Sequence, residues 1–287
     1  MTNISYHIQK DSDPLLATAI HNGHDVRHDV EKYLAIDELT RLREEDPCTG
    51  YWTDISENRL VGNMSRFQVD LNRPRSGAVY RFPSQSWGLK VWHDHVPQEV
   101  WDRSLREYDD FYKLLDRLVR GFLQSHGFFM IYDIHSYNYK RRNRNEEDDP
   151  ALNPEINIGT GTLDRRLWAP VIDHFTNQLR AYDYFGRHLD VRENIRFKGG
   201  YLAEWVHMHF PERACVLAIE FKKFFMDEWT GAVDFIQLQE IKKVLKDTIP
   251  GTLKNAEQVV HEIDRRESGR GINVRCSQRS AKRKWIK

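Results

Sequence analysis

Short apolar runs recur along the chain and end in polar or charged side chains. Residues 15–20, 128–134 and 215–225 form such runs, which are typical of strands covered on both faces of a sheet. Residues 59–71 also predict a strand, and Pro74 prevents that strand from continuing because proline cannot donate a ladder hydrogen bond. The pattern therefore predicts several buried strands.

Helical periodicity appears between these runs. In residues 104–126 apolar side chains recur at every third or fourth position, which predicts an amphipathic helix that ends at Gly127. Residues 166–183 predict a second helix, and residues 235–265 predict one or two helices split at the tripeptide IPG. Strands that alternate with helices predict an α/β fold of three layers, with a mixed central sheet flanked by helices.

Composition favours one globular domain with a small-molecule partner. The 287 residues are 40% hydrophobic, and Lys+Arg and Asp+Glu both number 43, so no net positive charge favours nucleic acid or a membrane surface. We assign residues 1–267 to a single domain. Residues 268–287 form a basic, glycine-containing tail, for which a frayed, disordered terminus is the simplest expectation.

The cysteines and the apolar runs bear on location. Cys48, Cys215 and Cys276 are widely separated and match neither a disulfide framework nor paired zinc ligands. No apolar run reaches the ~18 residues of a membrane span, and the N-terminal residues lack the apolar segment of a signal peptide. We therefore expect a cytoplasmic protein that does not bind membranes.

Polar residues near the ends of the apolar runs form a chemically consistent set, because ligands of α/β sheets collect at the carboxyl ends of strands. His21, His24 and His135 could bind a catalytic zinc and leave one position open for water. Glu220, in an apolar run, is a candidate general base. Asp133 could accept a hydrogen bond from the His135 ring if the chain turns between the two residues.

Arginines suggest a negatively charged substrate. The Arg73 guanidinium can bind a carboxylate with two hydrogen bonds, and the Asn72 amide can donate another. Arg66 could polarise a scissile carbonyl or stabilise its oxyanion. These residues favour a small, carboxylate-bearing substrate.

Each candidate also has a purely structural explanation. Glu220 could form a buried ion pair with Lys222 or Arg213, and Asn72 with Arg73 could form an ordinary turn. The candidate histidines could be structural residues with satisfied hydrogen bonds. Two further histidine pairs are rivals for the metal, and we interpret both as packing or rim residues: His93 with His95, and His207 with His209.

Three motifs, VDLNR at 69–73, DIHSY at 133–137 and AIEF at 218–221, resemble in this order the motifs of zinc carboxypeptidases. The chain is more closely similar to the N-formylglutamate amidohydrolase family. That resemblance extends from about residue 15 to 230 through IHNGH, REEDPCTGYW, SRFQVDLNRP, DIHSY, INIGTG, ENIRFKGGY and IEFKKFFMDE. It implies a zinc-carboxypeptidase-like fold, one Zn²⁺ ion, and hydrolysis of N-formyl-L-glutamate to formate and glutamate.

The resemblance also implies roles for single residues. His21 and His135 would bind the metal, Glu220 would be the base, and Asn72 with Arg73 would hold the substrate carboxylate. Four more residues would belong to a substrate loop: Arg196, Lys198, Gly199 and Gly200.

The second metal ligand stays open at this point. The carboxypeptidase pattern has a glutamate where this chain has His24, so that ligand is either His24 or a carboxylate of the Glu45-Asp46 pair, such as Asp46. A carboxylate would lower the net charge of the site, whereas three imidazoles would leave the full charge of the ion. Both sets are workable for a catalytic zinc.

The leading hypothesis is a metal-dependent amidohydrolase for a small N-acyl amino acid. One alternative is a zinc peptidase or deacylase for another acyl group, and turnover of N-acetyl or dipeptide substrates would distinguish it. A second alternative is a non-catalytic binding protein that kept the fold and lost the metal, and metal content would distinguish that one.

Overall fold

The structure is a computed structural model that describes residues 3–9 and 12–281, with side chains described as far as residue 268. The expected C-terminal tail therefore lies almost wholly outside the described side chains. The backbone of residues 268–281 continues the last helix, and residues 282–287 lie outside the described residues. Within the described part of the chain, no helix combines the length and the apolar character needed to cross a membrane.

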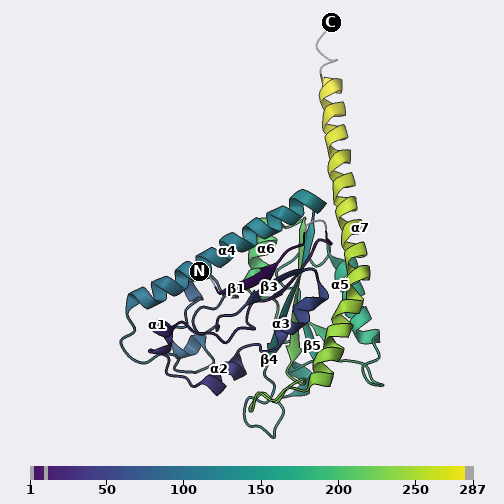
Figure 1. The fold of residues 1–287 in the computed structure, drawn as a ribbon. Helices are drawn as coiled ribbons and strands as arrows, with labels where there is room; N and C mark the ends of the chain where they lie inside the picture. The colour runs from purple at the N-terminus through teal and green to yellow at the C-terminus, as the bar shows by residue number, and fades with distance from the viewer. Residues whose placement is uncertain (1–2, 10–11, 282–287) are drawn as a thin grey trace.

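The centre of the molecule is a seven-stranded mixed sheet in the order β1-β3-β2-β4-β7-β5-β6 (Figure 1). The strands are β1 (Ile4–His7), β2 (Leu15–Ala19), β3 (Asn58–Gly62), β4 (Phe129–Tyr137), β5 (Ile156–Gly159), β6 (Val191–Glu193) and β7 (Ala214–Lys222). The four inner strands β3, β2, β4 and β7 are parallel, whereas β1 pairs antiparallel with β3 and β5 pairs antiparallel with β7.

Helices cover both faces of this sheet, as Figure 1 shows. One apolar cluster joins the sheet to α4 (Gln98–His126) and α6 (Tyr201–His209), and the other joins it to α3 (Thr49–Trp52), α5 (Ala169–Ala181) and α7 (Phe235–Ala281). Alternate residues of β4 contribute to the two clusters, because successive strand side chains point to opposite faces. The predicted α/β fold of three layers with a mixed sheet is confirmed.

The remaining helices, α1 (His28–Glu31) and α2 (Glu38–Glu44), lie in the connection between β2 and β3. The helix predicted for residues 104–126 is α4, which begins earlier, at Gln98, and ends where Gly127 adopts φ +76°. Glycine reaches this left-handed conformation without steric cost.

The strand predicted for residues 59–71 is wrong beyond Gly62, where β3 ends. A Cβ atom at Gly62 would lie 2.6 Å from the carbonyl oxygen of Ile20, so the chain passes close to its neighbour and then leaves the sheet in turns. Phe67, Val69 and Leu71 are nevertheless buried. Their alternation reflects packing of a loop and was mistaken for strand periodicity.

The last helix, α7, continues through Pro250, so the expected split at IPG does not occur. Proline removes the hydrogen bond to the carbonyl four residues earlier. That carbonyl belongs to Lys246, and both Lys246 and Pro250 are exposed, so water can replace the missing donor. The proline is thus tolerated on the solvent side of the helix.

Candidate metal centre and substrate pocket

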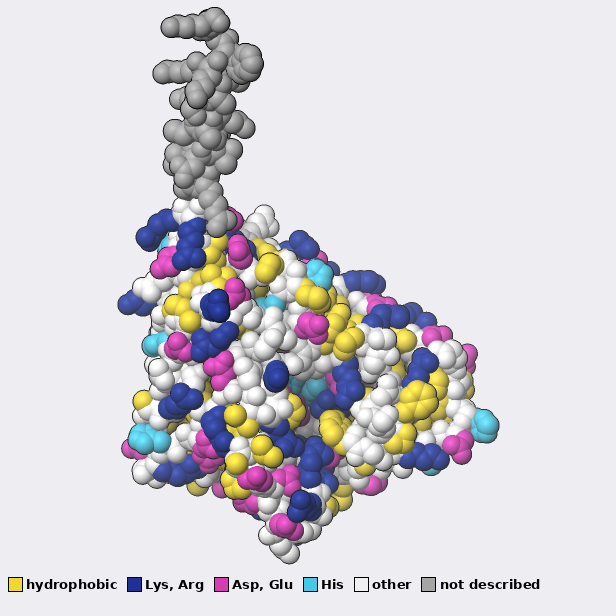
Figure 2. Space-filling view, turned by 180° about the vertical axis from the view of Figure 1, so that it is seen from behind, with side chains coloured by type: hydrophobic (Ala, Val, Ile, Leu, Met, Phe, Trp, Pro, Cys, Tyr) yellow, Lys and Arg dark blue, Asp and Glu magenta, His cyan; other side chains and the backbone are white. Residues whose placement is uncertain are grey.

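A cavity of about 200 Å³ opens at the carboxyl ends of the inner strands. His21 follows β2, His135 lies in β4 and Glu220 lies in β7, and all three line the cavity. Figure 2 shows this hollow, with a cyan histidine inside and dark blue Lys and Arg side chains around it. The cavity is smaller than a typical site for a drug-sized ligand, so it suits a small metabolite.

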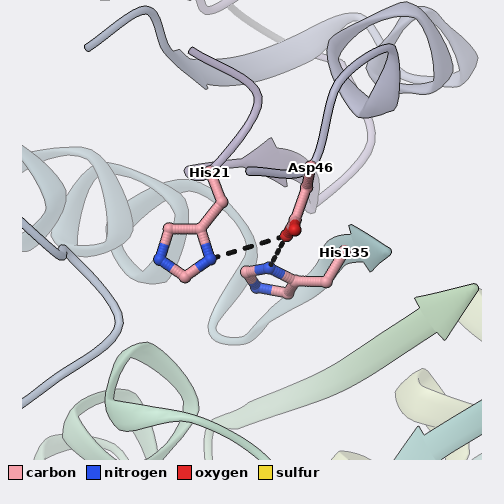
Figure 3. A group of neighbouring side chains, drawn as sticks. All are labelled: His21, Asp46 and His135. Carbon is pink, nitrogen blue, oxygen red and sulfur yellow. Dashed lines mark hydrogen bonds and ion pairs between the residues drawn. The ribbon is translucent and has the colours of Figure 1, made fainter. Parts of the chain in front are cut away.

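His21, Asp46 and His135 form a candidate metal site (Figure 3). Their ligand atoms all lie within 4.8 Å of one another, and all three residues are buried. The Asp46 Oδ2 atom lies 2.9 Å from His135 Nδ1 and 3.5 Å from His21 Nδ1. Two imidazole nitrogens and one carboxylate oxygen therefore converge, which is a ligand set that suits a divalent cation such as zinc.

The far side of each imidazole faces another carboxylate. His21 Nε2 lies 2.7 Å from Asp70 Oδ1, and His135 Nε2 lies 3.1 Å from Asp133 Oδ2. The second contact has the distance of an ion pair without hydrogen-bond angles, so Asp133 Oδ2 has no hydrogen-bond partner among the described residues. The hydrogen bond to Asp70 keeps the His21 proton on Nε2, and the negative charge of Asp133 favours the same position in His135, which leaves both Nδ1 atoms free to bind a cation.

Asp133 reaches His135 without the chain turn that we expected. Both residues lie in the continuous strand β4, where side chains two positions apart point to the same face. The Thr18 hydroxyl donates a 2.7 Å hydrogen bond to Asp133 Oδ1 and fixes the carboxylate. The expectation of a turn was wrong because it placed the two side chains on opposite faces.

The ionisation of the site also suits a cation. Burial alone would raise the pKa of Asp46, but hydrogen bonds from His135 and His21 hold it well below its usual range. Burial would likewise lower the pKa of His135, yet the neighbouring Asp133 and Asp46 raise it well above the usual value. Asp46 and Asp133 thus favour positive charge next to the two imidazole rings, and a bound dication would supply that charge.

The structure brings Asp46 to the two histidines and leaves His24 outside the group. The Asp46 amide donates a 3.0 Å hydrogen bond to the His21 carbonyl, which fixes its side chain beside the ring. Instead, His24 Nδ1 forms a hydrogen bond with the Glu45 carboxylate, and His24 Nε2 lies 3.4 Å from Glu38 Oε1. Residues 22–24 form neither helix nor turn, so the spacing of His21 and His24 does not place both rings on one side.

Glu220 occupies the position next to His135 in the sheet, because the two residues are register partners on the parallel strands β4 and β7. Burial raises the pKa of Glu220 to about 7, and nearby Asp46 adds to this effect while His135 opposes it. Among the described residues it forms no ion pair with Lys222 or Arg213. A carboxyl group with this pKa can both accept and donate a proton near neutral pH.

Asp70 organises the arginines beside the pocket. Its Oδ2 atom lies 2.8 Å from Arg66 Nη2 and 3.6 Å from Arg73 Nε. The Tyr80 hydroxyl also donates a hydrogen bond to Asp70 and accepts a 3.0 Å bond from Arg66 Nε, while the Arg73 guanidinium lies 4.7 Å from the Tyr80 ring centre. Asn72 directly precedes Arg73 in the same loop and donates its backbone N–H to Asp70 Oδ1 at 2.8 Å.

The predicted substrate loop lies against Asn72. Its side-chain oxygen accepts a 3.0 Å hydrogen bond from the Leu202 amide, and a Cβ atom at Gly200 would lie 2.2 Å from its Nδ2. Gly199 adopts φ +113°, which favours glycine. Arg196, Gly199 and Gly200 line the pocket, whereas Lys198 is exposed and does not.

Sequence patterns missed Lys223, which is 1% exposed and lines the pocket. Its ammonium donates hydrogen bonds of 2.6 and 2.7 Å to the carbonyls of Arg43 and Glu45, next to Asp46. Burial lowers its pKa to about 8, although Asp46 opposes the shift. A lysine inside the run IEFKKFF was the available signal, because a charged residue in a buried run needs a reason.

Two further pocket residues were also missed. Arg141 forms two hydrogen bonds with the Glu44 carboxylate, at 3.0 and 3.3 Å. The Trp87 ring centre lies 4.9 Å from the Arg66 guanidinium and 5.5 Å from the Arg141 guanidinium. These residues lie in loops of mixed composition that carried no recognisable pattern.

The rival histidine pairs lie outside the candidate metal group. His93 and His95 are exposed. His207 is buried in α6, where its Nε2 accepts a 3.0 Å hydrogen bond from the Val216 amide, and burial lowers its pKa to about 4. The sequence VHMHF at 206–210 alternates like a strand, but residues 206–209 belong to α6, where the buried Leu202 and Val206 follow the spacing of a helix.

A family model described as N-formylglutamate amidohydrolase matches residues 13–226. A crystal structure of N-formylglutamate amidohydrolase from Ralstonia eutropha JMP134 is similar, with a TM-score of 0.68, 18% identity, and coverage of 91% of this chain and 100% of that chain. The structure of a gene product from Agrobacterium tumefaciens has a TM-score of 0.64 and 16% identity, with coverage of 90% and 97%. A search of the curated proteins finds no match.

At identities of 18% and 16% the two solved structures support only the fold, so the assignment to a family rests on the family model. The matched residues include His21, Asp46, His135 and Glu220, and they make up most of the chain. The chain therefore belongs to the N-formylglutamate amidohydrolase family.

Proposed function

We propose that this protein is a zinc-dependent amidohydrolase that cleaves N-formyl-L-glutamate to formate and glutamate. The observation that carries the proposal is the convergence of His21, Asp46 and His135 beside Glu220, in one small cavity. Family membership supports hydrolysis of a linear amide. The zinc, the acyl group and the roles of single residues are parts of the proposal.

His21, Asp46 and His135 would hold the ion through two Nδ1 atoms and one carboxylate oxygen. A zinc ion bound there would lower the pKa of a water molecule and polarise the formyl oxygen. Asp70 and Asp133 would keep the two imidazoles in the tautomer that presents Nδ1 to the metal.

Glu220 would act as the general base and then as the acid. Its carboxylate would take a proton from the attacking water and return it to the leaving amide nitrogen, so that glutamate departs as an amine. Its pKa of about 7 supports both transfers. Its fixed position beside His135 supports contact with the same water.

Two arginines and an amide would position the substrate. Asn72 and Arg73 would hold its α-carboxylate, and Arg66 would stabilise the negative charge that develops on the formyl oxygen. The pocket is lined by five cationic side chains and four acidic ones, and a bound dication would add to the excess of positive charge. This balance supports an anionic substrate.

Two other functions fit parts of the structure. A zinc deacylase for a larger acyl group would share the metal site, and turnover of N-acetyl-L-glutamate would identify it. A binding protein without catalysis would contain no metal. The single domain of residues 1–267 and the cytoplasmic location remain predictions.

The first experiment is metal analysis of the purified wild type and of His135→Ala, with formate release from N-formyl-L-glutamate measured on the same samples. We expect about one zinc per wild-type chain, and loss of both metal and formate release in the variant. Bound metal without formate release would contradict N-formyl-L-glutamate as the substrate. Absence of metal, with no activity after zinc is added, would contradict the proposal that the protein is a zinc-dependent amidohydrolase.

A further inference from the structure

The four guanidinium groups of the substrate pocket differ in their partners. Arg66 and Arg73 share Asp70, and Arg141 is paired with Glu44. Arg196 has no acidic partner within ion-pair distance among the residues that the structure describes. It is therefore the pocket guanidinium whose charge is left for a ligand to neutralise.

The surroundings of Arg196 hold it in place without neutralising it. Its Nη1 donates a 2.6 Å hydrogen bond to the Asn153 side-chain oxygen, and its guanidinium lies 5.1 Å from the Tyr137 ring centre. Its Nε is buried and has no hydrogen-bond partner among the described residues. Burial, together with the charge of Arg141, lowers its pKa. A buried donor without a partner costs free energy, which a bound carboxylate would recover.

Arg196 and Arg73 both line the pocket but lie against different aromatic rings. Arg73 stacks on Tyr80, whereas Arg196 stacks on Tyr137 at the end of β4. Tyr137 is a register partner of Lys222, so the Tyr137 ring that Arg196 contacts lies next to the strand that carries Glu220. Two separate cationic positions suit a ligand with two carboxylates.

We propose that Arg196 is the residue that selects an acidic side chain in the substrate, by binding the side-chain carboxylate of the N-acyl amino acid while Asn72 and Arg73 hold the α-carboxylate. This inference rests on the proposed function. It assigns selectivity to Arg196 rather than to Arg141, because Glu44 already neutralises Arg141.

The test compares two substrates of nearly equal shape, N-formyl-L-glutamate and N-formyl-L-glutamine, with the wild type and with Arg196→Gln. A charge-assisted hydrogen bond contributes enough to change kcat/KM by about 10- to 100-fold. We expect the variant to lose this factor for the glutamate substrate alone, so the preference of the wild type for glutamate over glutamine should disappear. Equal losses for both substrates would overturn the inference and leave the hydrolase intact.

The matched control is Arg192→Gln. Arg192 lies four residues earlier, pairs with Asp190, and donates to the carbonyls of Pro150 and Ala151 outside the pocket. Its variant should keep the wild-type ratio of the two substrates. A loss of selectivity in both variants would indicate a general disturbance of the loop and would count against Arg196.

A binding measurement keeps the inference testable if neither substrate is hydrolysed. Calorimetric titration of the zinc-loaded protein with L-glutamate and L-glutamine should show tighter binding of glutamate by the wild type, and equal binding by Arg196→Gln. Equal affinities in the wild type would overturn the inference. If the wild type hydrolyses neither substrate but binds L-glutamate more tightly than L-glutamine, and Arg196→Gln loses this preference, the inference is upheld and the proposed reaction is contradicted.

Discussion

His135 and Glu220 are register partners on the neighbouring parallel strands β4 and β7. Paired residues of a sheet point to the same face, so an imidazole of the candidate metal site and a carboxyl group with a pKa of about 7 lie side by side. Strands in the centre of a sheet hold their side chains more precisely than loops do. This relationship underlies the proposed proton transfer.

Replacement of the base should stop hydrolysis and leave the metal in place. For Glu220→Gln we expect a fall in kcat of about 10²- to 10⁴-fold, the usual contribution of a positioned general base, with unchanged zinc content. Formate release and metal analysis on the same sample measure both quantities. The exposed Glu212 provides the control variant Glu212→Gln. A Glu220→Gln protein with the wild-type rate would remove Glu220 from the mechanism.

The raised pKa of Glu220 also predicts how stability depends on pH in the metal-free protein. The carboxyl group has a pKa of about 7 when folded and 4.5 in its unperturbed form, so the folded state binds more protons between these values. Stability from this group is present below pH 4.5 and is lost as pH rises through 7. Relative to Glu220→Gln, the wild type should lose about 2–3 kcal/mol across this window. Denaturant unfolding at several pH values measures the difference, and parallel curves would contradict it.

Two variants, one of Asp46 and one of His24, test which of these residues is the second metal ligand. Asp46→Asn should bind little or no zinc, because the neutral amide replaces the carboxylate between the two rings. His24→Ala should keep its zinc, since His24 contacts Glu45 and lies outside the group. Metal titration of both purified proteins gives the answer. The opposite pattern would make His24 the ligand.

Lys223 should support the segment that carries Asp46. In Lys223→Met the carbonyls of Arg43 and Glu45 lose a buried donor, which typically costs about 1–3 kcal/mol for each group left unpaired. We expect a lower free energy of unfolding and weaker zinc binding. The neighbouring Lys222 lies over the Tyr139 ring, so Lys222→Met tests loss of a lysine at the adjacent position. Equal stability of the two variants would contradict a special role for Lys223.

Gly200 should be essential for the position of Asn72. In Gly200→Ala the new methyl group would lie 2.2 Å from the Asn72 Nδ2 atom, so either the side chain or the loop must move. Because Asn72 is proposed to hold the substrate carboxylate, we expect mainly a higher KM. Gly77→Ala is the control, since a Cβ atom there meets nothing within 4 Å. Steady-state kinetics of both variants distinguish the outcomes.

The sequence predicted the elements that are long or strongly patterned. The helix α4 is long and has apolar residues at helical spacing, and the strands β4 and β7 are long and almost wholly buried. Their apolar residues therefore identify them in the sequence. The edge strands β1 and β6 and the neighbouring strand β5 have only three or four residues, too few for a period to appear. Their pairing depends on partners far away in the chain.

The candidate site was predictable where a motif marks the end of a strand. His21, His135 and Glu220 follow that rule and do meet in one cavity. Asp46 could be offered only as an alternative to His24, because a backbone hydrogen bond to His21 decides between them. Lys223 was missed because its two carbonyl partners, Arg43 and Glu45, lie at the end of α2, which no sequence pattern connects with β7.

The parallel pairing of the inner strands has a consequence for the order of events during folding. Thr18 and Asp133, which form a hydrogen bond between β2 and β4, are 115 residues apart in the chain. Pairing of such distant strands is slow, because the loop must close before the contacts form. We therefore expect His21 and His135 to meet late, after the sheet has assembled. Added zinc should slow unfolding of the finished protein, while its refolding rate should be nearly unchanged.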